Sequence, residues 1–112
     1  MGLFHWFKLE GRKVVISNEP PIESQKINVT DLEILDNKVR VSTVFLGMDT
    51  NYSNKGLPVV FETMVFGGPH EQSQFRYTSY EAAERGHELI VKYITGRLYE
   101  DEFYKSIEIE EA

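Results

Sequence analysis

The segment from Ser79 to Thr95 restricts the fold of this chain more than any other. Thr78 precedes it as an N-cap residue, and Glu81, three residues later, completes a capping box. Gly96 follows as the terminating residue, because glycine readily adopts the left-handed backbone that closes a helix. These signals predict one amphipathic helix over residues 79–95.

Polar side chains occupy only a narrow side of this predicted helix. The polar positions are Glu81, Glu84, Arg85, Glu88, Lys92 and Thr95. The remaining positions are apolar, aromatic or small apart from His87, so the helix is buried on more than one side. Ala82 and Gly86 allow a close backbone approach on the buried side. We expect the helix to pack on a sheet and to touch a second element, either the N-terminal hairpin or a second subunit.

The strands that such a helix would cover begin with a short hairpin over residues 3–16. Gly11 and Arg12 form its turn, with glycine where a positive φ is needed. The predicted cross-strand pairs are Glu10 with Lys13, Leu9 with Val14, and Phe7 with Ile16. An ion pair beside two apolar pairs is typical of a correctly registered hairpin.

A second hairpin belongs to an antiparallel sheet predicted over residues 27–78. Asp36 and Asn37 are expected in its turn, since both tolerate the left-handed region. The predicted pairs are Ile34 with Val39, Glu33 with Arg40, and Leu32 with Val41. Two further strands are expected at 57–66, where Pro58 fits only the start or an edge, and at 74–78.

The order of these elements predicts an α+β fold in a single domain over residues 1–112. A mostly antiparallel β-sheet of about four to six strands in hairpins packs against one long C-terminal amphipathic helix. Residues 97–112 form an acidic tail, in which the alternation from Ser106 to Glu110 also fits an edge strand.

Composition places this domain among cytoplasmic proteins that need no metal or disulfide to fold. It has 112 residues, 41% of them hydrophobic, and no cysteine, which excludes disulfides, cysteine-ligated zinc and cysteine nucleophiles. No segment is long and apolar enough to span a membrane. The net charge of −6 argues against direct nucleic-acid binding.

No motif in the sequence specifies a reaction, a metal or a nucleotide, so we expect no catalytic residue, no metal site and no cofactor. Glu62 is unusual because it lies inside the most apolar strand. It is interpreted as an ion-pair partner of one of three arginines, as an exposed edge residue, or as a perturbed acid in a pocket. The candidate ion-pair partners are Arg40, Arg76 and Arg97. His87 is interpreted as a core histidine bonded to a carbonyl or a carboxylate.

Aromatic residues are abundant, and Trp6 lies in a hairpin too small to bury all of its own. An interface is therefore expected, formed either with a protein partner or by self-association, with a homodimer favoured. The candidate binding residues are Trp6, Asp49, Thr50, Asn51, Tyr52, Glu62, Arg76 and His87.

Three blocks carry a resemblance to a known group of proteins. They are STVFLGMD at 42–49, FETMVFGG at 61–68 and RYTSYEAAERGH at 76–87. In this order they resemble a family of small uncharacterised proteins encoded by tailed bacteriophages and prophages. In that family a histidine follows the aspartate of the first block, whereas Thr50 stands here, so a role for that histidine cannot be transferred.

The resemblance implies a phage-borne accessory protein that works in the host bacterial cytoplasm. The leading expectation is a non-enzymatic protein that binds a host or phage macromolecule, with inhibition of a host defence system as one form of this. The first alternative is an oligomer that sequesters a nucleotide or another small molecule. The second is a small metal-assisted hydrolase that uses Asp49, Glu62 and either His87 or His70.

Overall fold

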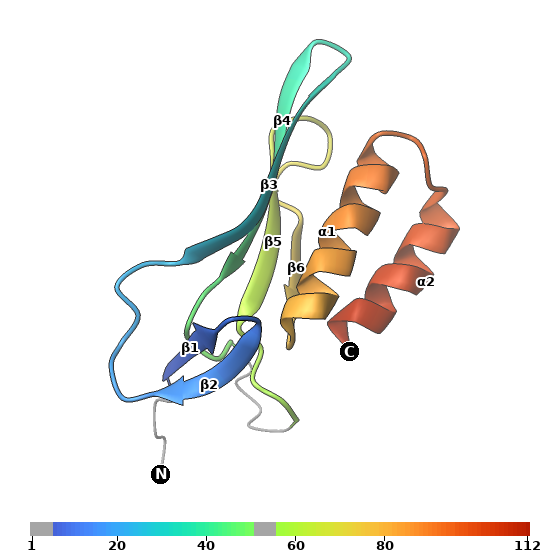
Figure 1. The fold of residues 1–112 in the computed structure, drawn as a ribbon. Helices are drawn as coiled ribbons and strands as arrows, with labels where there is room; N and C mark the ends of the chain where they lie inside the picture. Colours follow the sequence, from blue (N-terminus) through green and yellow to red (C-terminus); the bar gives the residue numbers. More distant parts are fainter. Residues whose placement is uncertain (1–5, 51–55) are drawn as a thin grey trace.

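The computed structural model describes residues 6–50 and 56–112 and has an α+β fold with antiparallel sheets (Figure 1). The strands are β1 (Trp6–Glu10), β2 (Lys13–Ser17), β3 (Gln25–Ile34), β4 (Asn37–Phe45), β5 (Phe61–Phe66) and β6 (Gln74–Tyr77), and the helices are α1 (Tyr80–Ile94) and α2 (Glu100–Glu111). The strands form a four-stranded sheet in the order β3-β4-β5-β6 and a separate two-stranded hairpin, β1-β2.

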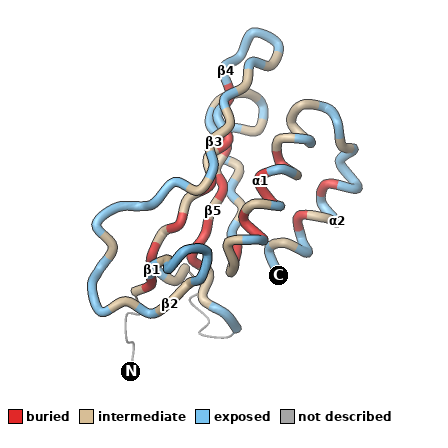
Figure 2. Tube along the Cα trace, viewed as in Figure 1, coloured by how far each residue is buried: buried red, intermediate tan, exposed pale blue. Residues whose placement is uncertain are grey.

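Helix α1 packs on one face of the four-stranded sheet, and α2 lies against α1 (Figure 1). Buried residues lie on β4, β5 and α1, so most of the core lies between the sheet and this helix (Figure 2). The wide apolar side of α1 predicted contact with a second element besides the sheet, and that element is mainly α2. The first hairpin also reaches α1, where the Arg12 guanidinium lies 4.8 Å from the centroid of the Tyr80 ring and ion-pairs with Glu84.

The prediction of one long C-terminal helix is only partly correct, because the chain forms two shorter helices. Residues 100–111, expected as an acidic tail or an edge strand, form α2. Phe103 and Ile107, one helical turn apart, are buried against the core. Glu100, Asp101 and Glu102 lie in the first turn, where acidic side chains favour the helix dipole.

Helix α1 ends as predicted but begins one residue later, and the predicted capping box is wrong because Glu81 stands only two residues after the observed N-cap. Ser79, not Thr78, is the N-cap, and its hydroxyl accepts a hydrogen bond from the Ala82 N–H at 3.1 Å. Gly96 has a φ of 76° and ends the helix as predicted. The N–H of Gly96 bonds to Tyr93 and the N–H of Arg97 to Lys92, which together form a Schellman motif.

Gly86 permits the close packing of α1 on the sheet that the sequence suggested. A Cβ atom at this position would overlap the ring of Tyr77, which is fully buried on β6. Only glycine lets the helix backbone approach the sheet so closely here.

The first hairpin has the predicted register. Its turn is Gly11–Arg12, and its pairs include Glu10 with Lys13, Leu9 with Val14, and Phe7 with Ile16. It attaches to the segment that follows β4 through the Phe7 N–H, which bonds to the Gly47 carbonyl at 2.9 Å, and through a bridge between Trp6 and Met48.

The predicted register of the second hairpin is wrong. Its turn residues are Leu35 and Asp36, with φ values of 48° and 67°, and Ile34 pairs with Asn37. Two positive φ values indicate a type I′ turn, which matches the twist of the flanking strands. Leu35 is an unusual residue for this conformation, and it is 90% exposed at the hairpin tip.

In the part of the chain that the structure describes, neither helix is long and apolar enough to cross a membrane.

Candidate functional site

The two faces of the four-stranded sheet differ because side chains alternate along each strand. One face lies under α1. The other, here called the outer face, is covered by neither α1 nor α2 (Figure 1). Alternation and register place on it Asp31 and Glu33 of β3, Lys38, Arg40, Ser42 and Val44 of β4, Glu62, Met64 and Phe66 of β5, and Gln74 and Arg76 of β6. An uncovered sheet face of this kind is available to a partner.

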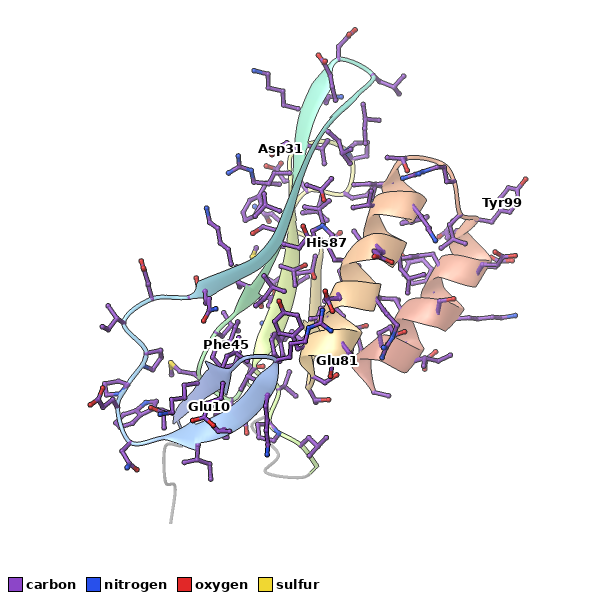
Figure 3. All side chains as sticks on the ribbon, viewed as in Figure 1. Glu10, Asp31, Phe45, Glu81, His87 and Tyr99 are labelled. Carbon is purple, nitrogen blue, oxygen red and sulfur yellow. The ribbon has the colours of Figure 1, made fainter. Side chains whose placement is uncertain are left out.

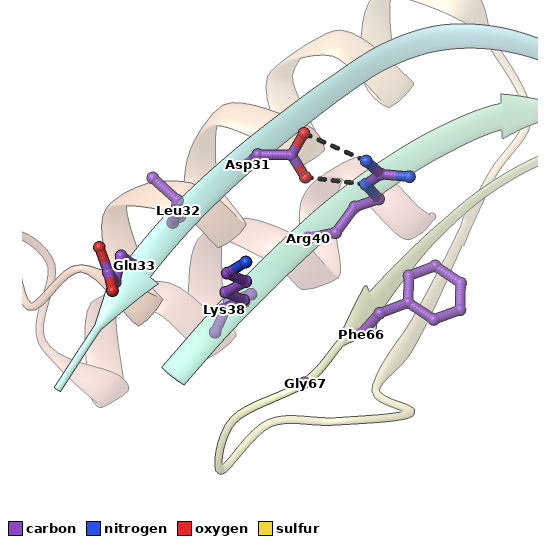
Figure 4. Close-up of a pocket in the computed structure, with 8 residues that line it drawn as sticks. Asp31, Leu32, Glu33, Lys38, Arg40, Phe66 and Gly67 are labelled. Carbon is purple, nitrogen blue, oxygen red and sulfur yellow. Dashed lines mark hydrogen bonds and ion pairs between the residues drawn. The ribbon is translucent and has the colours of Figure 1, made fainter. Parts of the chain in front are cut away.

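The outer face is hollowed where β3, β4 and β5 meet. The hollow has a volume of about 850 Å³ and is lined by Asp31, Leu32, Glu33, Lys38, Val39, Arg40, Phe66 and Gly67 (Figure 4). Phe66 is 46% exposed, which is unusual for a residue that ends a core strand. Gly67 has a φ of 85°, and a Cβ atom there would overlap the Lys38 carbonyl. Glycine thus lets the end of β5 pass close over the backbone of β4.

Charged pairs cross the hollow between β3 and β4. The guanidinium of Arg40 donates two hydrogen bonds to the carboxylate of Asp31, at 2.8 and 3.2 Å (Figure 4). The hydrogen bond from Arg40 lowers the pKa of Asp31, so this carboxylate is ionised at neutral pH. Glu33 stands opposite Lys38 in the register. Because all four side chains are exposed, these charges add little to stability and remain available to a partner.

Glu62 forms the ion pair that the sequence suggested, and its partner is Arg76. The two residues face each other across β5 and β6, with 3.1 Å between the Arg76 Nε and a carboxylate oxygen of Glu62. The Glu62 side chain is only 13% exposed. The pairing explains how a carboxylate is tolerated in this apolar strand.

Asp49 and Thr50 close the base of a loop. The Asp49 carboxylate accepts a hydrogen bond from the Val59 N–H at 2.8 Å. The Thr50 hydroxyl and N–H both donate to the Val59 carbonyl, at 2.9 and 2.8 Å. These bonds give both side chains a structural role. Asn51 and Tyr52 lie outside the described residues.

His87 lies at the centre of a buried polar network, pointing from α1 toward the sheet (Figure 3). Its Nε2 is 2.7 Å from the Thr30 hydroxyl and its Nδ1 is 2.7 Å from the Thr43 hydroxyl. Thr43 in turn bonds to Thr63 at 2.6 Å, and the Tyr77 hydroxyl donates to Thr63 at 3.0 Å. The predicted carbonyl or carboxylate partner is therefore wrong, and the partners are threonine hydroxyls on two strands.

Burial sets the protonation of this network. It lowers the pKa of His87 and raises the pKa of Tyr77 far above its ordinary value. A neutral imidazole has one donor and one acceptor nitrogen, which suits two hydroxyl neighbours. Among the described residues no buried side-chain polar atom lacks a hydrogen-bond partner. His87 is 1% exposed, so the network is part of the core and not an accessible reactive centre.

The candidate residues from the sequence do not form one site. Glu62 and Arg76 are paired on the outer face, whereas His87 is buried on the opposite face and Trp6 is half-buried in the first hairpin. Within residues 6–50 and 56–112, no three histidine, aspartate or glutamate side chains are grouped to hold a metal ion.

None of the residues around the hollow was among the candidate binding residues, although Arg40 was considered as an ion-pair partner of Glu62. The signal that could have identified them is the alternation of charged and apolar residues in 31–40, together with the apolar Phe66 at the end of its strand. The order of the strands is also needed, because it shows that these residues lie together on the outer face.

Comparisons with protein-family models, with curated proteins and with solved structures found no match.

Proposed function

We propose that this chain is a non-enzymatic accessory protein of the phage type, which binds a host or phage protein through its outer sheet face. The observation that carries the proposal is the hollow of about 850 Å³ beside the half-exposed Phe66, on the sheet face that neither α1 nor α2 covers. An aromatic side chain beside a hollow is typical of an interface anchor.

The charges around the hollow suit a protein partner. Asp31 and Glu33 of β3 are negative, and Lys38 and Arg40 opposite them on β4 are positive. The four charges sum to zero, so they can orient a protein partner without attracting one sign of charge in general. The chain as a whole has a charge of −6, which favours a protein over a nucleic acid. The expected setting is the host bacterial cytoplasm, where inhibition of a defence protein is one form that such binding takes.

The positions of the acidic residues and His87 support binding over hydrolysis. A metal-assisted hydrolase would need Asp49, Glu62 and a histidine to converge. Instead Asp49 is bonded to the backbone of Val59, Glu62 to Arg76, and His87 to two threonines. Each of these groups has a structural role of its own.

A second candidate is the binding of a small anionic molecule such as a nucleotide. The volume of the hollow falls within the range of small-molecule sites, and Lys38 and Arg40 line it. The other two arginines named as possible partners of Glu62 lie elsewhere. Arg76 pairs with Glu62, and Arg97 follows α1 on the helix side of the sheet.

Affinity capture of the tagged protein from bacterial lysate tests these proposals, with mass spectrometry of proteins and small molecules in the eluate. We expect a partner protein in stoichiometric amount, lost with Phe66→Ala. The control is Ile109→Ala, which removes an exposed apolar side chain on α2, away from the outer face, and should retain the partner. A nucleotide-sized ligand on an otherwise pure protein would favour the second candidate. Recovery of neither, or equal recovery with both variants, would contradict binding at the outer face.

A further inference from the structure

The two edges of the four-stranded sheet are not equivalent. The β6 edge is four residues long, and the Arg76 N–H on it donates a hydrogen bond to the Glu111 carboxylate of α2 at 3.1 Å. The β3 edge is ten residues long, and no strand in the described part of the chain pairs with its outer side (Figure 1). Long open edges favour pairing with another chain, and proteins usually shield them.

The turn of the second hairpin shows which backbone groups of β3 point away from β4, toward the open edge of the sheet. A two-residue type I′ turn is flanked by a hydrogen-bonded pair, here Ile34 and Asn37. Hydrogen-bonded and non-bonded pairs alternate along an antiparallel ladder. The backbone N–H and C=O groups of Val29, Asp31 and Glu33 therefore point away from β4, and no backbone bond from residues 25–34 to any described residue other than those of β4 is found.

Hollows lie beside β3 on both faces of the sheet. The outer hollow uses Asp31, Leu32 and Glu33. On the helix side, a smaller hollow of about 180 Å³ is lined by Asn28, Thr30, His87, Glu88, Val91, Lys92 and Arg97. Leu32 and Ile34 are only partly buried against the core at this edge. A strand added to β3 would thus find space for side chains on each face.

We propose that the β3 edge binds an extended segment of the partner protein as a fifth strand. The residues of this segment that lie on the outer face would be basic, because Asp31 and Glu33 would be their nearest neighbours there. Its helix-side residues would be apolar, and they would complete the burial of Leu32 and Ile34. The inference rests on the proposed function, which it extends by naming the chemistry of the partner.

Charge disfavours a second copy of this chain as the added strand. Two β3 strands side by side would place Asp31 and Glu33 of one copy on the same face as those of the other. Like charges on neighbouring strands are destabilising, and each copy already has a net charge of −6.

A short peptide of alternating lysine and valine is the probe. It is titrated into the full isotope-labelled chain and followed by NMR, with a peptide of alternating glutamate and valine as the control. We expect the lysine peptide to slow hydrogen exchange at the amides of Val29, Asp31 and Glu33, and the glutamate peptide to have no effect. Backbone pairing buries these amides, whereas contact with side chains alone would not.

Two substitutions at one position separate the backbone from the side chain. Glu33→Pro removes an N–H that points to the open edge and leaves the hydrogen bonds between β3 and β4 intact. It should lower the affinity for the lysine peptide roughly tenfold, the effect of about one lost hydrogen bond. Glu33→Gln keeps the N–H and should lower the affinity for the lysine peptide by only about two- to fivefold. Thermal unfolding checks that each variant folds, and Val29→Pro provides the same test if Glu33→Pro does not.

Three outcomes would overturn the edge proposal. If the lysine peptide binds wild type and Glu33→Pro equally and shifts only signals of Arg40 and Phe66, then the outer face alone is the site and the proposed function stands. Absence of lysine-peptide binding at millimolar concentration would reject strand addition, and the capture experiment would then decide the proposed function by itself. A dimer in solution that Glu33→Pro converts to a monomer would identify a second copy as the occupant.

Discussion

The two faces of the four-stranded sheet use polar side chains in opposite ways. On the helix side, Thr43, Thr63 and His87 are buried and bonded to one another. On the outer face, Asp31 and Arg40 form an ion pair that water surrounds. A buried polar group costs free energy unless it is paired, whereas an exposed pair gains little. Substitutions on the helix side should therefore affect folding, and those on the outer face should affect binding.

The largest contrast is expected from two phenylalanines of β5. Phe61 is fully buried against Phe45 and Tyr80, and Phe61→Ala should lower the free energy of unfolding by about 3–5 kcal/mol. Phe66→Ala, on the outer face of the same strand, should lower it by less than about 1 kcal/mol. Urea denaturation of both variants measures the difference. Equal losses would mean that the outer face is part of the core.

The next contrast uses neighbouring residues of β4. Thr43→Val leaves a nitrogen of His87 without its hydroxyl partner, so the free energy of unfolding should fall by about 1–3 kcal/mol. Ser42→Ala, on the outer face, should change it by less than about 0.5 kcal/mol. Urea denaturation measures both variants. An unchanged free energy of unfolding for Thr43→Val would show that the network does not stabilise the fold.

The pH dependence of stability tests the burial of His87. In the unfolded chain this histidine has its ordinary pKa of 6.5, and burial lowers its pKa in the folded chain. Below pH 6.5 the unfolded state therefore binds more protons, so the free energy of unfolding falls as the pH falls through this window. His87→Gln should show a shallower decrease between about pH 7 and about pH 5. Equal slopes for wild type and variant would indicate that solvent reaches the ring.

The smallest effect on folding is expected at the outer ion pair. Asp31→Asn and Arg40→Gln should leave the urea midpoint unchanged within error, because both side chains are exposed. The same variants should weaken capture of the partner, and more strongly at low ionic strength, where charges are less screened. A lowered midpoint would show that the outer face has a structural role instead.

Several features were predictable because their signals are local. Helix α1 was defined within about one residue at each end by its capping residues and Gly96. The register of the first hairpin followed from a glycine turn between matched pairs. Pairing with an arginine was one of three interpretations of Glu62, because an unpaired carboxylate in an apolar strand is costly. Each of these inferences needed only neighbouring residues or one general energetic rule.

Other features depend on contacts between distant segments. Ile107 and Ile109 fit a strand pattern as well as a helix, and only the contact of Phe103 and Ile107 with the core selects α2. The turn of the second hairpin was predicted one residue too late, because Leu35 and Asp36, not Asp36 and Asn37, adopt the left-handed conformation. These choices depend on long-range packing, which single-sequence patterns do not encode.

The candidate binding surface shows the same division most clearly. Alternation along 31–40 was visible in the sequence, but which side would be covered and which left open was not. The helix covers the side with Thr43 and Val41, where burial of apolar surface and satisfied hydroxyls outweighs the loss of hydration. The local sequence thus determined where the strands and α1 form, whereas the packing of α1 and α2 determined that Asp31, Arg40 and Phe66 face the solvent.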